Sequence, residues 1–142
     1  MVHMIDEREV QKKYIMLQMM KQQLNALAEQ KNLINEKIAE LAVSIDALKK
    51  LKNVKKGQNI MTTLGSNVFV SADIQDTENV LVNIGNGILA RKSREDAIVF
   101  LGLRMTEIGD IDKELTSEIN KYVEEIQRLE PELQRMVEQM QE

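Results

Sequence analysis

Apolar residues recur every seven positions in two long stretches of this 142-residue chain, over residues 5–56 and 93–142. In the first stretch, the seam positions from Leu17 to Leu48 are all apolar except Lys31. In the second stretch, Asp112 is the polar exception within the seam. A heptad pattern sustained over so many turns predicts coiled-coil helices rather than helices of a compact globule.

The segment between them, residues 57–92, alternates apolar and polar positions and therefore predicts short strands. Gly65-Ser66 and Gly85-Asn86-Gly87 provide turn residues, so we expect two β-hairpins. Two hairpins alone have unpaired edges and little core, and other chains should complete a sheet or barrel with them. The apolar residues expected at this oligomer interface are Leu64, Val68, Val70, Ile74, Val80, Val82, Ile84 and Ile88.

These elements predict one α+β domain over residues 1–142, a long antiparallel two-helix coiled coil with two central β-hairpins. Pairing residues whose numbers sum to 146 places apolar seam positions of one helix opposite those of the other. Lys31 and Asp112 then fall in adjacent layers on opposite helices. We expect them to approach each other and help fix the register, a role that polar seam residues can have at some cost in stability.

Charge is distributed unevenly along the chain. Residues 5–56 contain 11 basic and 7 acidic side chains, whereas residues 94–142 contain 6 basic and 13 acidic ones. Oppositely charged arms favour pairing with each other over nucleic-acid binding. The run "KKLKNVKK" could be a nuclear-localisation or phosphate-binding patch, but a solvated helix C-terminus explains its cations better, because they favour the negative end of the helix dipole.

Composition also argues against several classes of function. The chain has no Cys and one His, which disfavours a disulfide framework, a histidine-based metal site and a Ser-His nucleophile. No apolar run approaches the length of a membrane span, and no signal segment is recognisable. We therefore expect a cytoplasmic protein that is not an enzyme, has no cofactor and binds neither membrane nor nucleic acid.

The central sequence "LGSNVFVSADIQDTENVLVNIGNGILARKSREDAIVFL" resembles the alpha-type subunit of prefoldin, a holding chaperone of archaea and eukaryotes. The resemblance implies a hexamer of two alpha and four beta subunits, whose hairpins form β-barrels between the subunits and whose coiled coils project from them. It also implies ATP-independent binding of non-native proteins and their delivery to a group II chaperonin. The alternative is a structural subunit that assembles into filaments through its hairpins. A plain coiled-coil tether would not need the strands.

The helix ends far from the hairpins in sequence are unusually rich in Met. Ile15, Met16 and Met19 fall outside the seam, and flexible Met side chains suit surfaces that accept many partners. Leu133 faces Lys13 in the expected register and Pro131 interrupts the second helix, so we expect a frayed, apolar-lined end. The alternative, ordinary seam packing, accounts for some of these residues. The residues expected to bind clients are Ile15, Met16, Met19, Met20, Met136, Val137 and Met140.

Overall fold

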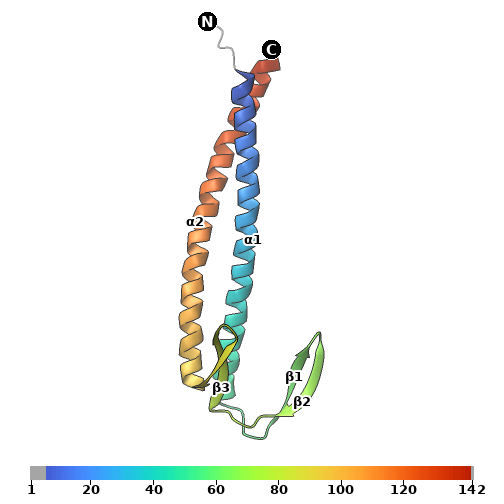
Figure 1. Ribbon diagram of the computed structural model, residues 1–142, viewed down its shortest axis with the longest axis vertical. Coiled ribbons are helices and arrows are strands. Elements are labelled where there is room, and N and C mark those ends of the chain that lie inside the picture. Colours follow the sequence, from blue (N-terminus) through green and yellow to red (C-terminus); the bar gives the residue numbers. More distant parts are fainter. Residues whose placement is uncertain (1–5, 142) are drawn as a thin grey trace. The chain divides into compact units, whose positions relative to one another are not determined.

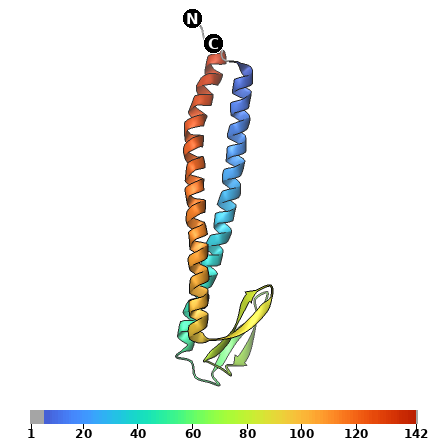
Figure 2. The ribbon, with the colours of Figure 1, turned by 60° about the vertical axis from the view of Figure 1, so that its left-hand side comes forward.

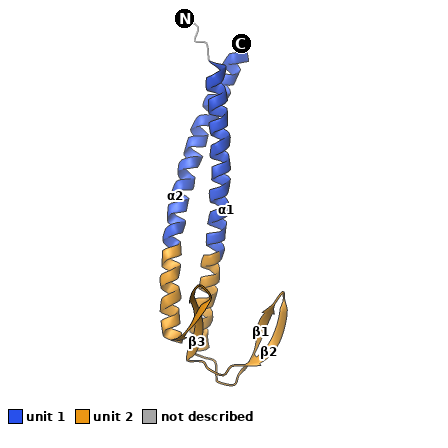
Figure 3. Ribbon diagram, in the orientation of Figure 1, with its two compact units in different colours: residues 1–36, 109–142 blue, residues 37–108 orange. Residues whose placement is uncertain are grey.

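The computed structural model of the chain describes residues 6–141 (Figure 1). Its elements, in order, are α1 (Glu7–Leu51), β1 (Asn59–Gly65), β2 (Val68–Asp73), β3 (Asn79–Gly85), β4 (Ile88–Ser93) and α2 (Arg94–Gln141). The predicted pair of long helices and two antiparallel hairpins is confirmed. The chain divides into two compact units, shown in Figure 3: unit 1 contains residues 1–36 and 109–142, and unit 2 contains residues 37–108.

In unit 1, α1 and α2 run side by side in opposite directions (Figure 2). Leu17 of α1 packs against Ile126, Leu129 and Leu133 of α2, and these four side chains are all less than a tenth exposed. Val10, Met20 and Leu24 cover the cluster from α1. Leu17 and Leu129 are one of the pairs that the expected register places together, so the predicted seam holds in this unit.

Ion pairs also connect the two helices of unit 1. Lys13 contacts Glu132, Lys21 contacts Glu130, and Lys31 contacts Asp112. In each pair the lysine comes from α1 and the carboxylate from α2. The predicted attraction between a basic first arm and an acidic second arm therefore appears as three specific contacts.

The expectation of a frayed helix end is wrong for the described residues. α1 is helical from Glu7, and α2 continues without interruption through Pro131 to Gln141. Leu133 is 7% exposed, although the simple pairing rule placed it opposite Lys13. A seam residue enters a space between several residues of the facing helix, so Val10 and Leu17 can cover Leu133 while Lys13 turns to Glu132.

In unit 2, the two hairpins are separate two-stranded sheets, β1–β2 and β3–β4. No closed barrel forms within residues 6–141. Ile60 pairs with Ala72 in the first hairpin, and Val82 pairs with Ala90 in the second. Each hairpin has a register shift just before its turn, at Thr63/Gly65 and at Asn83/Gly85.

The two turns share one local arrangement that sequence alternation alone does not indicate. The amide of Gly65 donates a hydrogen bond to Thr63 Oγ1, and the amide of Gly85 donates one to Asn83 Oδ1, each at 2.9 Å. The next two residues in each turn have positive φ, which are Ser66 and Asn67 in one and Asn86 and Gly87 in the other. Such left-handed pairs form the tight turns whose twist matches that of antiparallel strands.

The helix boundaries differ from the expectation at one end. α1 ends at Leu51 and not at residue 56. The backbone beyond it is drawn into the first hairpin, because the Gly57 amide donates to the Ile74 carbonyl at 2.7 Å and the Ile74 amide donates to the Gln58 carbonyl at 3.0 Å. α2 begins as expected after Ser93, whose Oγ accepts a hydrogen bond from the Asp96 amide at 3.1 Å.

Candidate protein-binding surfaces

Four apolar side chains near the start of α1 are exposed, and we call Tyr14, Ile15, Met16 and Met19 the α1 strip. Ile15 is 57% exposed and Met19 is 63% exposed. Residues three and four apart lie on one side of a helix, so Ile15, Met16 and Met19 form a continuous apolar surface. The intervening Leu17 points the other way, into the buried cluster. Residues 14–19 therefore contribute side chains both to the buried cluster and to the exposed surface.

A groove of about 310 Å³, which we call the end groove, adjoins this strip and extends it onto α2. Tyr14 and Ile15 line one side, and Leu133 and Val137 line the other, with Val10 and Gln11 completing it. Its lining is predominantly apolar, and both helices contribute. A partner segment lying there could bury apolar side chains without displacing the seam.

The structure separates the seven residues expected to bind clients into two groups. Met20 and Met136 are only partly exposed, and Met20 packs against the buried cluster, as ordinary seam residues do. The other five side chains are exposed and available for contact: Ile15, Met16, Met19, Val137 and Met140. Tyr14, 55% exposed, was missed by the sequence reasoning, although its position directly beside the apolar run is a signal that could have found it.

Electrostatics near the end groove come from the Lys13–Glu132 pair. The hydrogen bond that Lys13 donates to Glu132, and the attraction of its charge, lower the pKa of the Glu132 carboxyl below its usual value. The pair is about one-third exposed on each side chain. The pair therefore holds the Lys13 ammonium at Glu132, and neither residue lines the apolar groove.

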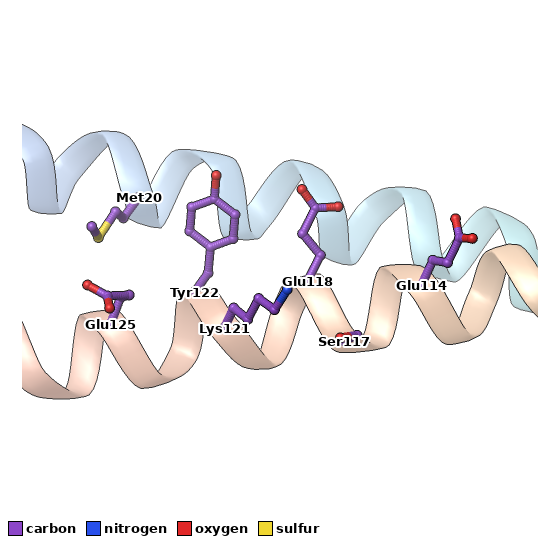
Figure 4. Close-up of a pocket in the computed structure, with 7 residues that line it drawn as sticks. All are labelled: Met20, Glu114, Ser117, Glu118, Lys121, Tyr122 and Glu125. Atoms are coloured by element: carbon purple, nitrogen blue, oxygen red, sulfur yellow. The ribbon is translucent and has the colours of Figure 1, made fainter.

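A second groove in unit 1, of about 610 Å³, lies along one side of α2 next to Met20 (Figure 4). We call it the Met20–Tyr122 groove. Tyr122 and Met20 provide its apolar surface. Its remaining lining is polar and mostly acidic, and consists of Glu114, Ser117, Glu118, Lys121 and Glu125.

In unit 2, the first hairpin exposes almost all of its side chains. Only Ile60 in β1 and Ala72 in β2 are partly covered. Leu64 is 70% exposed and Phe69 is 59% exposed, although they are large apolar residues. Because both faces of this hairpin are open, its predicted interface residues Leu64, Val68 and Val70 are all accessible.

The second hairpin is covered on one face. Val82 is 9% exposed, whereas Leu81 is 66% exposed. Val80 and Val82 line a groove of about 550 Å³ together with Leu41 of α1 and Leu101 of α2. The expectation that Val82 lies at an interface between chains is therefore corrected, because its side chain is buried within its own unit.

The remaining interface residues of the prediction lie at more open positions. Ile84 and Ile88 flank the turn of the second hairpin and are 44% and 58% exposed. Ile74 and Val80 are partly exposed. The accessible apolar surface of the second hairpin is thus concentrated at its turn, with Leu81 and Leu89 on the outer face.

Asp76 holds the connection between the two hairpins. Its Oδ1 accepts hydrogen bonds from the backbone amides of Glu78 and Asn79, at 2.8 and 3.0 Å, and Arg91 lies 3.2 Å from its Oδ2. The Glu78 amide above all, and then that of Asn79, lower the pKa of the Asp76 carboxyl. Arg94 adds to this connection by donating to the Thr77 carbonyl at 3.0 Å.

Lys31 and Asp112, predicted to approach each other, are brought together in unit 1. Lys31 Nζ lies 2.7 Å from Asp112 Oδ1, and the two side chains are 29% and 23% exposed. The pair is therefore partly buried, in a stretch of the seam whose other positions on α1 are apolar from Leu17 to Leu48. Its role in fixing the register stays a prediction.

Two negative observations apply to the described part of the chain. Neither helix has a stretch that is both apolar and long enough for a membrane crossing. Within residues 6–141, no three His, Cys, Asp or Glu side chains gather in a way that could hold a metal ion.

Comparison with known proteins gives a consistent result. Residues 20–139 match the family model described as "Prefoldin subunit". The prefoldin alpha subunit of Thermofilum pendens is 34% identical over 93 residues, which are 66% of this chain and 72% of that protein. The prefoldin alpha subunit of Methanocorpusculum labreanum is 31% identical over 120 residues, covering 84% of this chain and 82% of that protein.

Two solved structures share the fold. One is described as filamentous PFD from Methanocaldococcus jannaschii, with a TM-score of 0.71, 22% identity and coverage of 80% of this chain and 93% of that one. The other is the prefoldin beta subunit from Thermococcus strain KS-1, with a TM-score of 0.58, 16% identity and coverage of 89% and 90%. At these identities, the likeness concerns the fold.

Proposed function

The chain belongs to the prefoldin family, and we propose that it is an alpha-type subunit of an ATP-independent cytoplasmic chaperone. In this proposal the α1 strip and the adjoining end groove bind non-native proteins and prevent their aggregation. The bound proteins are then passed to a group II chaperonin. The relatives named as alpha subunits support the subunit type.

The exposed α1 strip is the observation that carries the proposal. Large apolar side chains in water are unfavourable, and a contiguous apolar patch on a folded protein commonly marks a binding surface. Met is unbranched and polarizable, so Met16 and Met19 can adapt to differently shaped apolar segments. Non-native proteins expose such segments without a common sequence, which is the kind of ligand this surface suits.

Assembly would use the hairpins of unit 2. The first hairpin leaves both faces uncovered, and its strands have unpaired edges. We propose that beta-type subunits cover these faces, with two alpha and four beta subunits per hexamer. A related beta subunit has the same fold, which supports pairing between similar hairpins.

A filament is the second candidate assembly. One of the solved structures that share the fold is described as filamentous. In a filament the same hairpins would join copies of this chain without a beta partner. Size-exclusion chromatography separates the two, because a filament elutes as long, heterogeneous polymers whereas a hexamer forms only when a beta subunit is added.

The chaperone proposal is tested by making the α1 strip polar. A variant with Ile15→Gln, Met16→Gln and Met19→Gln changes exposed side chains and leaves Leu17 in place. It should assemble normally on size-exclusion chromatography and yet suppress less of the light scattering of a denatured enzyme diluted from guanidinium, without nucleotide.

A control variant removes apolar surface elsewhere on α1. Leu33 and Val43 are 66% and 70% exposed, so Leu33→Gln with Val43→Gln makes a similar chemical change away from the strip. This control should keep full holding activity. Unchanged holding activity in the strip variant, or an equal loss of holding activity in both variants, would show that the α1 strip is not the client-binding site.

A further inference from the structure

The Met20–Tyr122 groove is separate from the α1 strip and combines two surfaces that suit one kind of ligand. Tyr122 lies on α2 with its ring directed toward α1, and the Met20 side chain of α1 lies near it (Figure 4). These side chains give the groove an apolar floor. A volume of about 610 Å³ is enough for several side chains of a bound peptide.

Carboxylates follow one side of α2 along this groove. Glu114, Glu118 and Glu125 are spaced four and seven residues apart, so they lie on the same side of the helix as Tyr122. Lys121 is the one cationic side chain that lines the groove. The groove therefore has an acidic rim over an apolar floor.

These carboxylates differ in the partners that they already have. Glu125 contacts Arg128 at 2.7 Å and therefore already has a cationic partner. Glu114 and Glu118 make no ion pair within residues 6–141. Their charges are therefore the ones available to an incoming cation.

We propose that this groove binds segments of non-native protein that carry Lys or Arg next to apolar side chains. The inference rests on the proposed chaperone function and names the class of client that the complex prefers. The ammonium or guanidinium group would lie between Glu114 and Glu118, while the neighbouring apolar side chain contacts Met20 and Tyr122. An Arg could also stack on the Tyr122 ring.

Charge complementarity favours this occupant over others. Attraction between opposite charges raises the rate of encounter and discriminates between partners, and like charges disfavour binding. An acidic segment would meet the carboxylates of Glu114 and Glu118, which are not ion-paired within residues 6–141. The groove should therefore distinguish cationic from anionic segments of equal apolar content, which the uncharged α1 strip does not do.

The test uses the full-length chain assembled with a prefoldin beta subunit. A Glu114→Gln/Glu118→Gln variant removes the two unpaired charges at the groove. A matched control, Glu124→Gln/Glu138→Gln, removes two charges from exposed positions of the same helix that do not line the groove. Binding is measured by fluorescence anisotropy with a short labelled peptide of Leu and Lys, and with one in which Gln replaces Lys.

The groove variant should bind the Lys peptide roughly fivefold more weakly than the unmodified chain, as expected for the loss of two exposed ion pairs. The control variant should change this affinity by less than about twofold. The Gln peptide should bind equally to all three proteins. High salt should reduce the affinity of the unmodified chain for the Lys peptide toward that of the groove variant.

Equal weakening in the groove and control variants would overturn the inference, because net charge alone would then explain the preference. A change of assembly size in the groove variant would also overturn it, since another subunit would then occupy the groove. The proposed function fails in a different way: the unmodified complex would not suppress aggregation of any denatured enzyme.

Discussion

Replacing Leu129 by alanine should lower the free energy of unfolding by about 3 kcal/mol. Leu129 is 4% exposed and packs with Leu17, Ile126 and Leu133 in the buried cluster of unit 1. The substitution tests whether this cluster holds the two helices together.

The magnitude follows from the burial. Alanine lacks three carbon atoms of the leucine side chain, and burial of each contributes about 0.8 kcal/mol, which gives roughly 2.4 kcal/mol. The space left behind adds to this loss. A two-helix seam can close partly around the missing atoms, which places the total toward the lower part of the range known for such substitutions, at about 3 kcal/mol.

Leu33 gives a matched control in the same unit. Its side chain is 66% exposed, so the transfer part of Leu33→Ala should be only about a third as large. Alanine also has the higher helix propensity, which offsets some of that loss. We expect Leu33→Ala to change the free energy of unfolding by less than about 0.5 kcal/mol.

Urea unfolding followed by circular dichroism at helical wavelengths measures both effects. With a slope of about 2 kcal/mol per molar urea, Leu129→Ala should move the midpoint down by about 1.5 M. Protein concentration must be equal in all samples, because association adds to the apparent stability. Equal shifts for Leu129→Ala and Leu33→Ala, or no shift for either, would refute the assignment of the seam.

Three further predictions concern one ion pair, one carboxyl group and two glycines. A double-mutant cycle with Lys31→Ala and Asp112→Ala should give a coupling energy of about 1 kcal/mol that falls with salt. A coupling energy of zero would contradict the proposed role of this ion pair in fixing the register of the two helices. The pKa of the Asp76 carboxyl, measured by nuclear magnetic resonance, should lie below its usual value. The stability that the carboxylate contributes is present above the unfolded pKa of about 3.9 and is lost as the pH falls through the lower folded pKa. Asp76→Asn should abolish this pH dependence. Gly85 has φ +127°, a backbone conformation that side chains disfavour, so Gly85→Ala should lower the free energy of unfolding by about 1–2 kcal/mol. Gly102 lies in open space on α2, so Gly102→Ala should raise it by up to about 1 kcal/mol. Midpoints of thermal unfolding that move in the same direction for both variants would contradict this contrast.

The sequence predicts the elements well because their patterns are local. Heptads define both helices, and alternation with glycine turns defines four strands close to their observed bounds. The end of α1 was placed too late because the Lys-rich segment is compatible with a helix. Beyond Leu51 the chain pairs through Gly57 and Gln58 with Ile74, a partner distant in sequence that the local pattern does not reveal.

The surfaces are harder to predict than the elements. Alternation shows that Val80 and Val82 share a face, but it does not show that helices cover this face. The pairing rule identifies Lys13 as the residue opposite Leu133, but it does not show that neighbouring residues bury Leu133. The Lys31–Asp112 contact was predictable because both residues are polar exceptions in otherwise apolar seams.

The open first hairpin has a consequence for how the protein must be produced. A newly synthesised copy carries an apolar ribbon, with Leu64, Phe69 and Met61 in water, until the proposed partner subunit covers it. Each surplus copy is thus a seed for unwanted association. If the proposed beta-type subunit is its partner, we expect cells to match the two rates of synthesis and to degrade any excess.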